Sequence, residues 1–114
     1  MIEIHAFVAK MARLLGLSYP ISVKIYDGDS TPEGWDGYHL FENGRHTIAV
    51  AEYPYRGFMA VLCHEIAHAM VTEVLPEDEP FHGVNFQLAC VEVTNVALQL
   101  GCNVGAIYDP LTDE

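Results

Sequence analysis

Two histidines and a glutamate stand together near the middle of the chain, in the run His64-Glu65-Ile66-Ala67-His68. In a helix, four residues advance about 400°, so His64 and His68 leave the same face one turn apart. Two imidazoles at this spacing reach a single metal ion at about 2.0–2.1 Å from each ring nitrogen. The run therefore predicts a metal-binding helix.

Glu65 directly follows the first of these histidines. It lies about 100° around the helix from His64, so its carboxylate reaches a water on the metal without ligating the ion itself. The metal lowers the pKa of that water, and the carboxylate accepts the proton as general base. The run thus predicts a catalytic site, because a purely structural site needs no base.

Two histidines do not complete such a site, since a catalytic zinc usually takes three protein ligands. The downstream candidates are His82, Glu73, Glu77, Glu79 and Glu92. His82 opens a predicted helix after a connection of 13 residues, Gly83 allows close approach of the backbone, and Phe86 is placed to pack behind the site. Glu92, in the middle of the same helix, stays the alternative third ligand.

The elements that position these residues follow from hydrophobic periodicity and turn composition. Asn43-Gly44 between two strand-like runs is a strong hairpin signal, because both residues tolerate a positive φ. The order of the predicted elements is helix, three strands, helix, helix, which is a compact α+β domain. They span residues 2–16 (helix), 20–27 (strand), 37–42 and 46–52 (hairpin), 55–73 (helix carrying the motif) and 83–100 (helix).

The combination of HExxH, a short connection and then His82-Gly83-Val84-Asn85-Phe86 resembles the SprT-like zinc metallopeptidases. The resemblance covers about residues 1–100 and implies a minimal zincin-like fold. It further implies that His64, His68 and His82 are the zinc ligands and Glu65 the general base. Residues 1–114 are then a single metallopeptidase domain, in which 101–114 form an acidic tail.

The resemblance also implies that the run Ile48-Ala49-Val50-Ala51 is an edge strand that binds an extended peptide through main-chain hydrogen bonds. An ordinary strand inside the sheet is the alternative. SprT-like proteins that act on DNA-linked proteins often carry a zinc ribbon or a basic region. This chain shows neither, so a role in DNA repair is not expected.

Composition narrows the class of partner. Sixteen acidic and five basic residues give a formal net charge of −11, which repels phosphate backbones, so no nucleic acid is expected. The chain has no apolar run long enough to span a membrane. Its three cysteines are odd in number and without CxxC spacing, which indicates buried thiols in a reducing compartment and predicts a cytoplasmic protein.

Other polar residues receive ordinary structural roles. His5, His39 and His46 are interpreted as surface or packed histidines, since histidine has many uses besides ligation. The acidic residues between the two C-terminal helices, Glu73 among them, are expected to be solvated. Nothing distinguishes Tyr53, Tyr55 or Tyr108 as the hydroxyl that stabilises an oxyanion.

Three functions are compatible with these residues. The first is a zinc metallopeptidase acting on a peptide or protein. The second is a non-catalytic, zinc-stabilised binding or regulatory module with the same ligands. The third is a metal-free interaction domain in which the motif has no chemical role. Glu65 favours the first.

Overall fold

The protein is an α+β domain of three helices and a three-stranded sheet, in the order that the sequence predicts. The computed structural model describes residues 3–54, 56–74 and 82–107. Observed boundaries lie within three residues of the predicted ones. The elements are α1 (Ile4–Leu14), β1 (Ile21–Tyr26), β2 (Gly37–Glu42), β3 (Arg45–Ala51), α2 (Phe58–Val74) and α3 (Val84–Gln99).

The sheet is mixed, with strand order β1-β3-β2. β3 pairs with β1 in parallel and with β2 in antiparallel. The β2–β3 hairpin closes through Asn43 and Gly44, whose φ angles are 53° and 71°. Two consecutive positive φ angles match the twist of the flanking strands, so the predicted Asn-Gly hairpin is confirmed.

The prediction that Ile48–Ala51 forms an edge strand is wrong. These residues belong to β3, the central strand of the sheet, and all four are fully buried. Their main chain is paired with β1 on one side and with β2 on the other, so it is not available to a peptide. The physical reason for the error is that a run of four apolar residues does not show which strands lie beside it.

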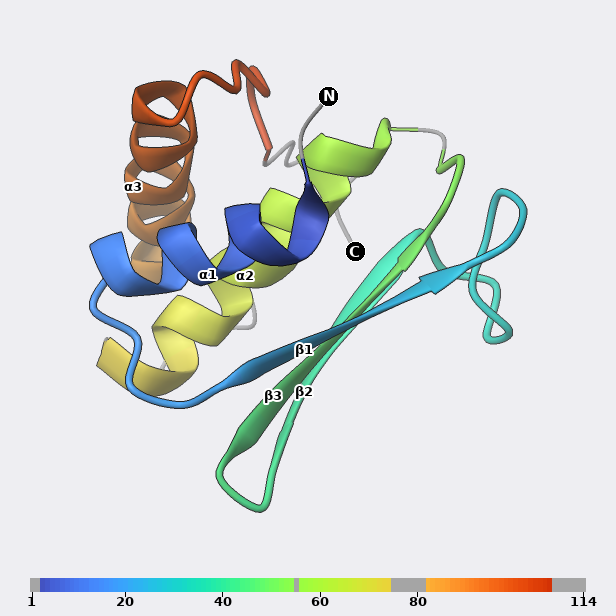
Figure 1. Ribbon diagram of the computed structural model, residues 1–114, viewed down its shortest axis with the longest axis horizontal. Helices are drawn as coiled ribbons and strands as arrows, with labels where there is room; N and C mark the ends of the chain where they lie inside the picture. Colours follow the sequence, from blue (N-terminus) through green and yellow to red (C-terminus); the bar gives the residue numbers. More distant parts are fainter. Residues whose placement is uncertain (1–2, 55, 75–81, 108–114) are drawn as a thin grey trace.

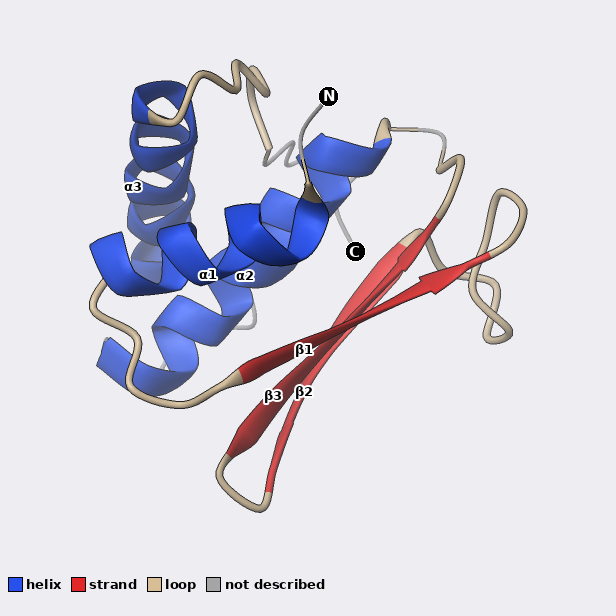
Figure 2. Ribbon diagram, in the orientation of Figure 1, coloured by secondary structure: helices blue, strands red, loops and turns tan. Residues whose placement is uncertain are grey.

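The helices gather on one side of the sheet (Figures 1 and 2). α2 packs against β2 and β3, while α1 contacts β1 and α3 packs on α2. The core between the layers is built on α2, where Val61, Leu62, Cys63, Ile66 and Ala67 are completely buried. The helix that carries the motif is therefore the one most enclosed by the fold.

The segment after α3 turns back onto the core instead of forming a solvated tail. Cys102 is 7% exposed and Ile107 is 5% exposed. The acidic tail expected at 101–114 is described only as far as Ile107, and the rest of that stretch lies outside the described residues. The predicted burial of Cys63 and Cys90 is confirmed, and Cys102 is buried as well. Within the described ranges, no helix is long and apolar enough to cross a membrane.

Candidate metal centre

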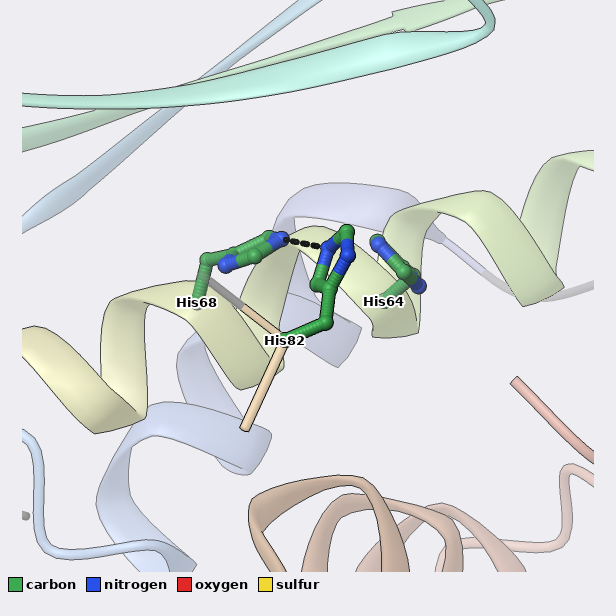
Figure 3. A group of neighbouring side chains, drawn as sticks. All are labelled: His64, His68 and His82. Carbon is green, nitrogen blue, oxygen red and sulfur yellow. Dashed lines mark hydrogen bonds between the residues drawn. The ribbon is translucent and has the colours of Figure 1, made fainter. Parts of the chain in front are cut away.

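Three histidines from two distant segments of the chain meet beside α2. His64 and His68 project from this helix one turn apart, and His82 approaches from the residues that lead into α3 (Figure 3). One ligand atom from each lies within 4.8 Å of the others. The structure thus brings together the three residues that the sequence singles out as metal ligands.

The spacing of the ring nitrogens suits a common metal ion. Nε2 of His68 and Nε2 of His82 are 3.2 Å apart. Two nitrogens bound to one tetrahedral zinc at about 2.05 Å are separated by about 3.3 Å, so this distance is the one expected for a shared ion. Three imidazoles are a donor set that zinc accepts readily.

Phe86 forms the apolar support of the cluster. Its ring stacks on His68 with centroids 4.3 Å apart and lies 4.6 Å from that of His82 and 5.0 Å from that of His64. The side chain is 1% exposed. Contact with all three rings restricts their rotation, so Phe86 has the packing role that the sequence analysis assigned to it.

The tautomer of His64 is set by the C-terminal segment. Nδ1 of His64 lies 2.7 Å from the carbonyl oxygen of Ile107. A carbonyl only accepts, so Nδ1 carries a proton and Nε2 is the nitrogen that would bind a metal. Sequence analysis missed this contact, because a main-chain carbonyl 43 residues away leaves no signal in residue type.

The side chain of Glu65 is buried, with an exposed fraction of 5%. Such burial is unusual, because glutamate side chains in proteins are mostly exposed. β2 lies close to it because Gly37 has no side chain. A Cβ at Gly37 would stand 2.7 Å from the carbonyl oxygen of Ala49, 2.8 Å from Val61 Cγ1 and 3.6 Å from Glu65 Cγ. The motif carboxylate is thus enclosed between α2 and the edge of the sheet, where its interactions are little weakened by water.

Burial keeps His68 in its neutral, metal-binding form. Burial of the ring, together with the neighbouring His64, His82 and His39, lowers the pKa of His68 to about 3. A neutral imidazole has the free lone pair that ligation requires. The cluster is therefore ready for a cation near neutral pH.

The other candidate ligands do not join this group. Glu92 is exposed on α3 and is not among the clustered side chains. Glu73 is engaged elsewhere, with a side chain that is 4% exposed and bound to His46. The expectation that Glu73 is solvated is wrong, because α2 extends to Val74 and carries the carboxylate back under the sheet. Glu77 and Glu79 lie outside the described residues.

The tyrosines considered for oxyanion stabilisation gain no support. Tyr53 is 70% exposed, and Tyr55 and Tyr108 lie outside the described residues. His5 is a surface residue, as expected. His46 is fully buried and His39 partly so, and both take part in a hydrogen-bonded chain that sequence reasoning did not foresee.

Comparison with known proteins adds no relative to these observations. No protein-family model matches the chain, and no curated protein sequence is significantly similar to it.

Proposed function

We propose that the chain is a zinc-dependent metallopeptidase of the SprT-like type that hydrolyses peptide bonds. The observation that carries this proposal is the convergence of His64, His68 and His82 next to the enclosed carboxylate of Glu65. Three neutral-imidazole donors with an adjacent base are the components of a hydrolytic zinc site.

Each residue has a distinct part in the chemistry. His64, His68 and His82 would hold the ion, with His64 oriented by Ile107 and all three rings supported by Phe86. Zinc, when bound, supplies the positive charge that polarises a carbonyl and acidifies water. Glu65 accepts the proton of the attacking water and returns it to the leaving amine, so it is regenerated in each turnover.

The substrate that fits this site is an extended peptide, and β2 is the strand that would receive it. β2 pairs with β3 along one side and is an edge of the described sheet. Its first residue, Gly37, packs next to Glu65. A peptide that adds to this edge through main-chain hydrogen bonds would pass the catalytic carboxylate. β2 thus takes the place that the sequence analysis gave to Ile48–Ala51.

A non-catalytic, zinc-stabilised module is the competing function. Structural zinc sites are closed by four protein ligands, whereas the cluster found among the described residues has three. A structural site also has no use for a carboxylate enclosed at its border. Both features favour the peptidase.

The chemistry of the whole chain suggests its partners and surroundings. A formal net charge of −11 disfavours nucleic acid and leaves a peptide or protein as the partner. Three buried, unbridged thiols suit a reducing compartment, so we propose a cytoplasmic location.

The first experiment measures metal by elemental analysis in the wild type, His82→Ala and Glu92→Ala. About one zinc per chain is expected in the wild type and in Glu92→Ala, and almost none in His82→Ala. A protein that binds no metal after zinc addition would exclude the peptidase and leave an interaction domain. Loss of zinc in Glu92→Ala alone would move the third ligand to that residue.

The second experiment separates the base from the ligands. Glu65→Gln keeps the shape of the side chain but cannot accept a proton, so zinc should stay bound while peptide hydrolysis falls by at least about 100-fold. If this variant loses zinc as well, Glu65 is a ligand and its assigned role is wrong.

A further inference from the structure

β1 is one edge of the described sheet and β2 is the other (Figure 1). The main-chain N–H of His46 donates to the carbonyl of Pro20, and that of Glu52 donates to the carbonyl of Tyr26. These bonds lie at the two ends of the parallel β1–β3 ladder. Because alternate residues of a parallel strand face the partner strand, the even-numbered residues of β1 direct their polar groups to β3. The odd-numbered residues direct their N–H and C=O groups away from the sheet; they are Ile21, Val23 and Ile25.

A groove of about 300 Å³ lies between this edge and α1. Ile21 and Val23 form its wall on the strand, and Val8, Ala9 and Ala12 line it on the helix. Alanine side chains are short, so they leave room for the side chain of another molecule. A row of outward-facing main-chain donors and acceptors is also a template for a further strand. The groove would then receive alternate side chains of that strand.

The opposite face of β1 is basic. Ile21 and Val23 face α1, so Ser22 and Lys24, which alternate with them, face the other side of the sheet. Nη1 of Arg45 donates to Oγ of Ser22 at 2.9 Å, which holds the guanidinium over this face of β1. Lys24 is exposed. Two positive charges therefore border the edge on the face away from the helices.

Basic residues gather around β1 although the whole chain is strongly acidic. α1 and β1 contain three of the five basic residues and none of the sixteen acidic ones; the three are Lys10, Arg13 and Lys24. The Debye length is about 8 Å at physiological ionic strength, so the charges of more distant acidic residues are largely screened. A segment bound along β1 therefore meets a local positive charge and not the net charge of −11.

We propose that the free edge of β1 is a peptide-binding site that takes an extended segment in which apolar and acidic side chains alternate. The main chain of the segment pairs with the odd-numbered residues of β1. Its apolar side chains enter the groove beside α1, and its carboxylates face Lys24 and Arg45 on the other side. This site lies on the opposite edge of the sheet from β2, and it stands whether or not the chain is a peptidase.

The probe is a fluorescein-labelled, end-blocked peptide with the sequence Asp-Val-Asp-Val-Asp-Val, and fluorescence anisotropy measures its affinity. We expect a Kd of about 10–100 μM. The affinity should be the same with and without zinc, because the three candidate metal ligands do not line the groove. Zinc-loaded samples carry Glu65→Gln, which keeps the probe intact if the protein is a peptidase. Val-Val-Val-Asp-Asp-Asp has the same composition without the alternation and should bind at least about 10-fold more weakly.

Amide hydrogen exchange locates the bound peptide without any substitution. In the free protein the amides of Ile21, Val23 and Ile25 should exchange rapidly, whereas those of Ser22 and Lys24 are protected by β3. Saturation with the probe should slow the first three and leave the other two unchanged. Protection of β2 amides with no change in β1 would place the peptide beside the metal centre and overturn the inference.

The groove and the main-chain edge are tested by two matched pairs of variants. Ala9→Phe fills the groove and should weaken binding at least about 10-fold, whereas Ala6→Phe, on an exposed alanine of α1 outside the groove, should bind as the wild type. Ile25→Pro removes an outward N–H and should weaken binding about 5-fold, whereas Ile25→Ala keeps this donor and should have a smaller effect. Ala9 is exposed, so Ala9→Phe keeps the inference testable if Ile25→Pro fails to fold.

The charge preference is tested by reversing one lysine at a time. Lys24→Glu should weaken binding of the probe about 5-fold, and Lys10→Glu, on α1 outside the groove, should change it less than 2-fold. Equal losses in the two variants would overturn the preference for acidic segments. The absence of binding up to about 1 mM probe would overturn the site itself. Self-association in sedimentation experiments that Ile25→Pro abolishes would assign the edge to a second copy of the chain and also overturn the inference.

Discussion

Two groups of histidines lie along α2, and they use their ring nitrogens in opposite ways. His64, His68 and His82 converge, so that one nitrogen of each approaches a common point. His39 and His46 are connected in series, and both nitrogens of His46 are occupied, one by Glu73 and one by His39. Convergent lone pairs suit a cation. In the serial arrangement, by contrast, each ring nitrogen of His46 shares a hydrogen bond with another side chain.

The comparison shows that residue type alone does not define a metal site. The serial group holds two histidines and a glutamate. From residue type alone, these three side chains would be acceptable metal ligands. Its geometry excludes a shared ion, because Glu73 and His39 bind opposite sides of the same ring. Among the described residues, the group with metal-binding geometry is the convergent one.

The largest expected difference between the two groups is in metal content. His68→Ala removes a convergent lone pair and should abolish zinc binding, whereas His46→Ala should keep about one zinc per chain. Elemental analysis after dialysis measures both variants against the wild type. If His46→Ala loses zinc at a temperature where the variant is folded, the expected difference between the convergent and the serial group is wrong.

In the absence of metal, a substitution in the serial group should lower the free energy of unfolding more than a substitution in the convergent group. His46→Ala leaves the Glu73 carboxylate buried without its imidazole partner, so the free energy of unfolding should fall by about 3–5 kcal/mol. Urea denaturation of the zinc-free proteins measures the change, with His5→Ala as the exposed control. A decrease in the free energy of unfolding of less than about 1 kcal/mol would mean that water hydrogen-bonds to Glu73 nearly as well as the imidazole does.

Gly37 connects the two groups, because it sets the distance between β2 and α2. Gly37→Ala brings a Cβ within 2.7 Å of the Ala49 carbonyl oxygen, a main-chain atom that cannot move aside. The free energy of unfolding should fall by about 1–3 kcal/mol, and kcat should fall because β2 and Glu65 shift apart. Zinc content should be unchanged, since the three ligands lie on α2 and before α3. A variant with wild-type kcat would show that β2 does not position the reaction.

The last expected effect is a dependence of stability on pH. The pKa of His39 falls from 6.5 to about 4 on folding. Between these values the unfolded chain binds a proton that the folded protein does not, so stability decreases as the pH falls through this window. One such group gives a slope of at most about 1.4 kcal/mol per pH unit. His39→Gln should flatten the profile of the zinc-free protein in urea denaturation. An unchanged profile would place His39 in contact with solvent.

Local patterns in the sequence predict most of the secondary structure and two of the three ligands of the candidate metal site. The Asn43-Gly44 turn and the i, i+4 spacing of His64 and His68 depend on dihedral preferences and helical pitch, which act over a few residues. The order of the elements follows from the same short-range periodicity. The candidate third ligand is not predicted in this way, because the sequence offers several candidates and only the spacing of the family motif favours His82.

The errors have one physical origin. The central place of β3, the burial of Glu73 and the contact between His64 and Ile107 all join segments that are distant in the chain. The apolar run Ile48–Ala51 is compatible with an edge or a central strand until the partner strands are known. Likewise, the sequence predicts that a glutamate near the end of a helix is solvated, because it does not show that a strand packs against that part of the helix.

The sequence by itself therefore identified the helix with the candidate metal ligands His64 and His68, the neighbouring carboxylate of Glu65 and the α+β class of the fold, because these depend on patterns within single elements and on the order of those elements. Only the tertiary structure decided that β2 is the edge strand next to Glu65 and that Glu73, His46 and His39 form a chain. The direction of a hydrogen bond depends on which groups meet when distant elements pack, and this is fixed by the burial of the whole core and not by any local pattern.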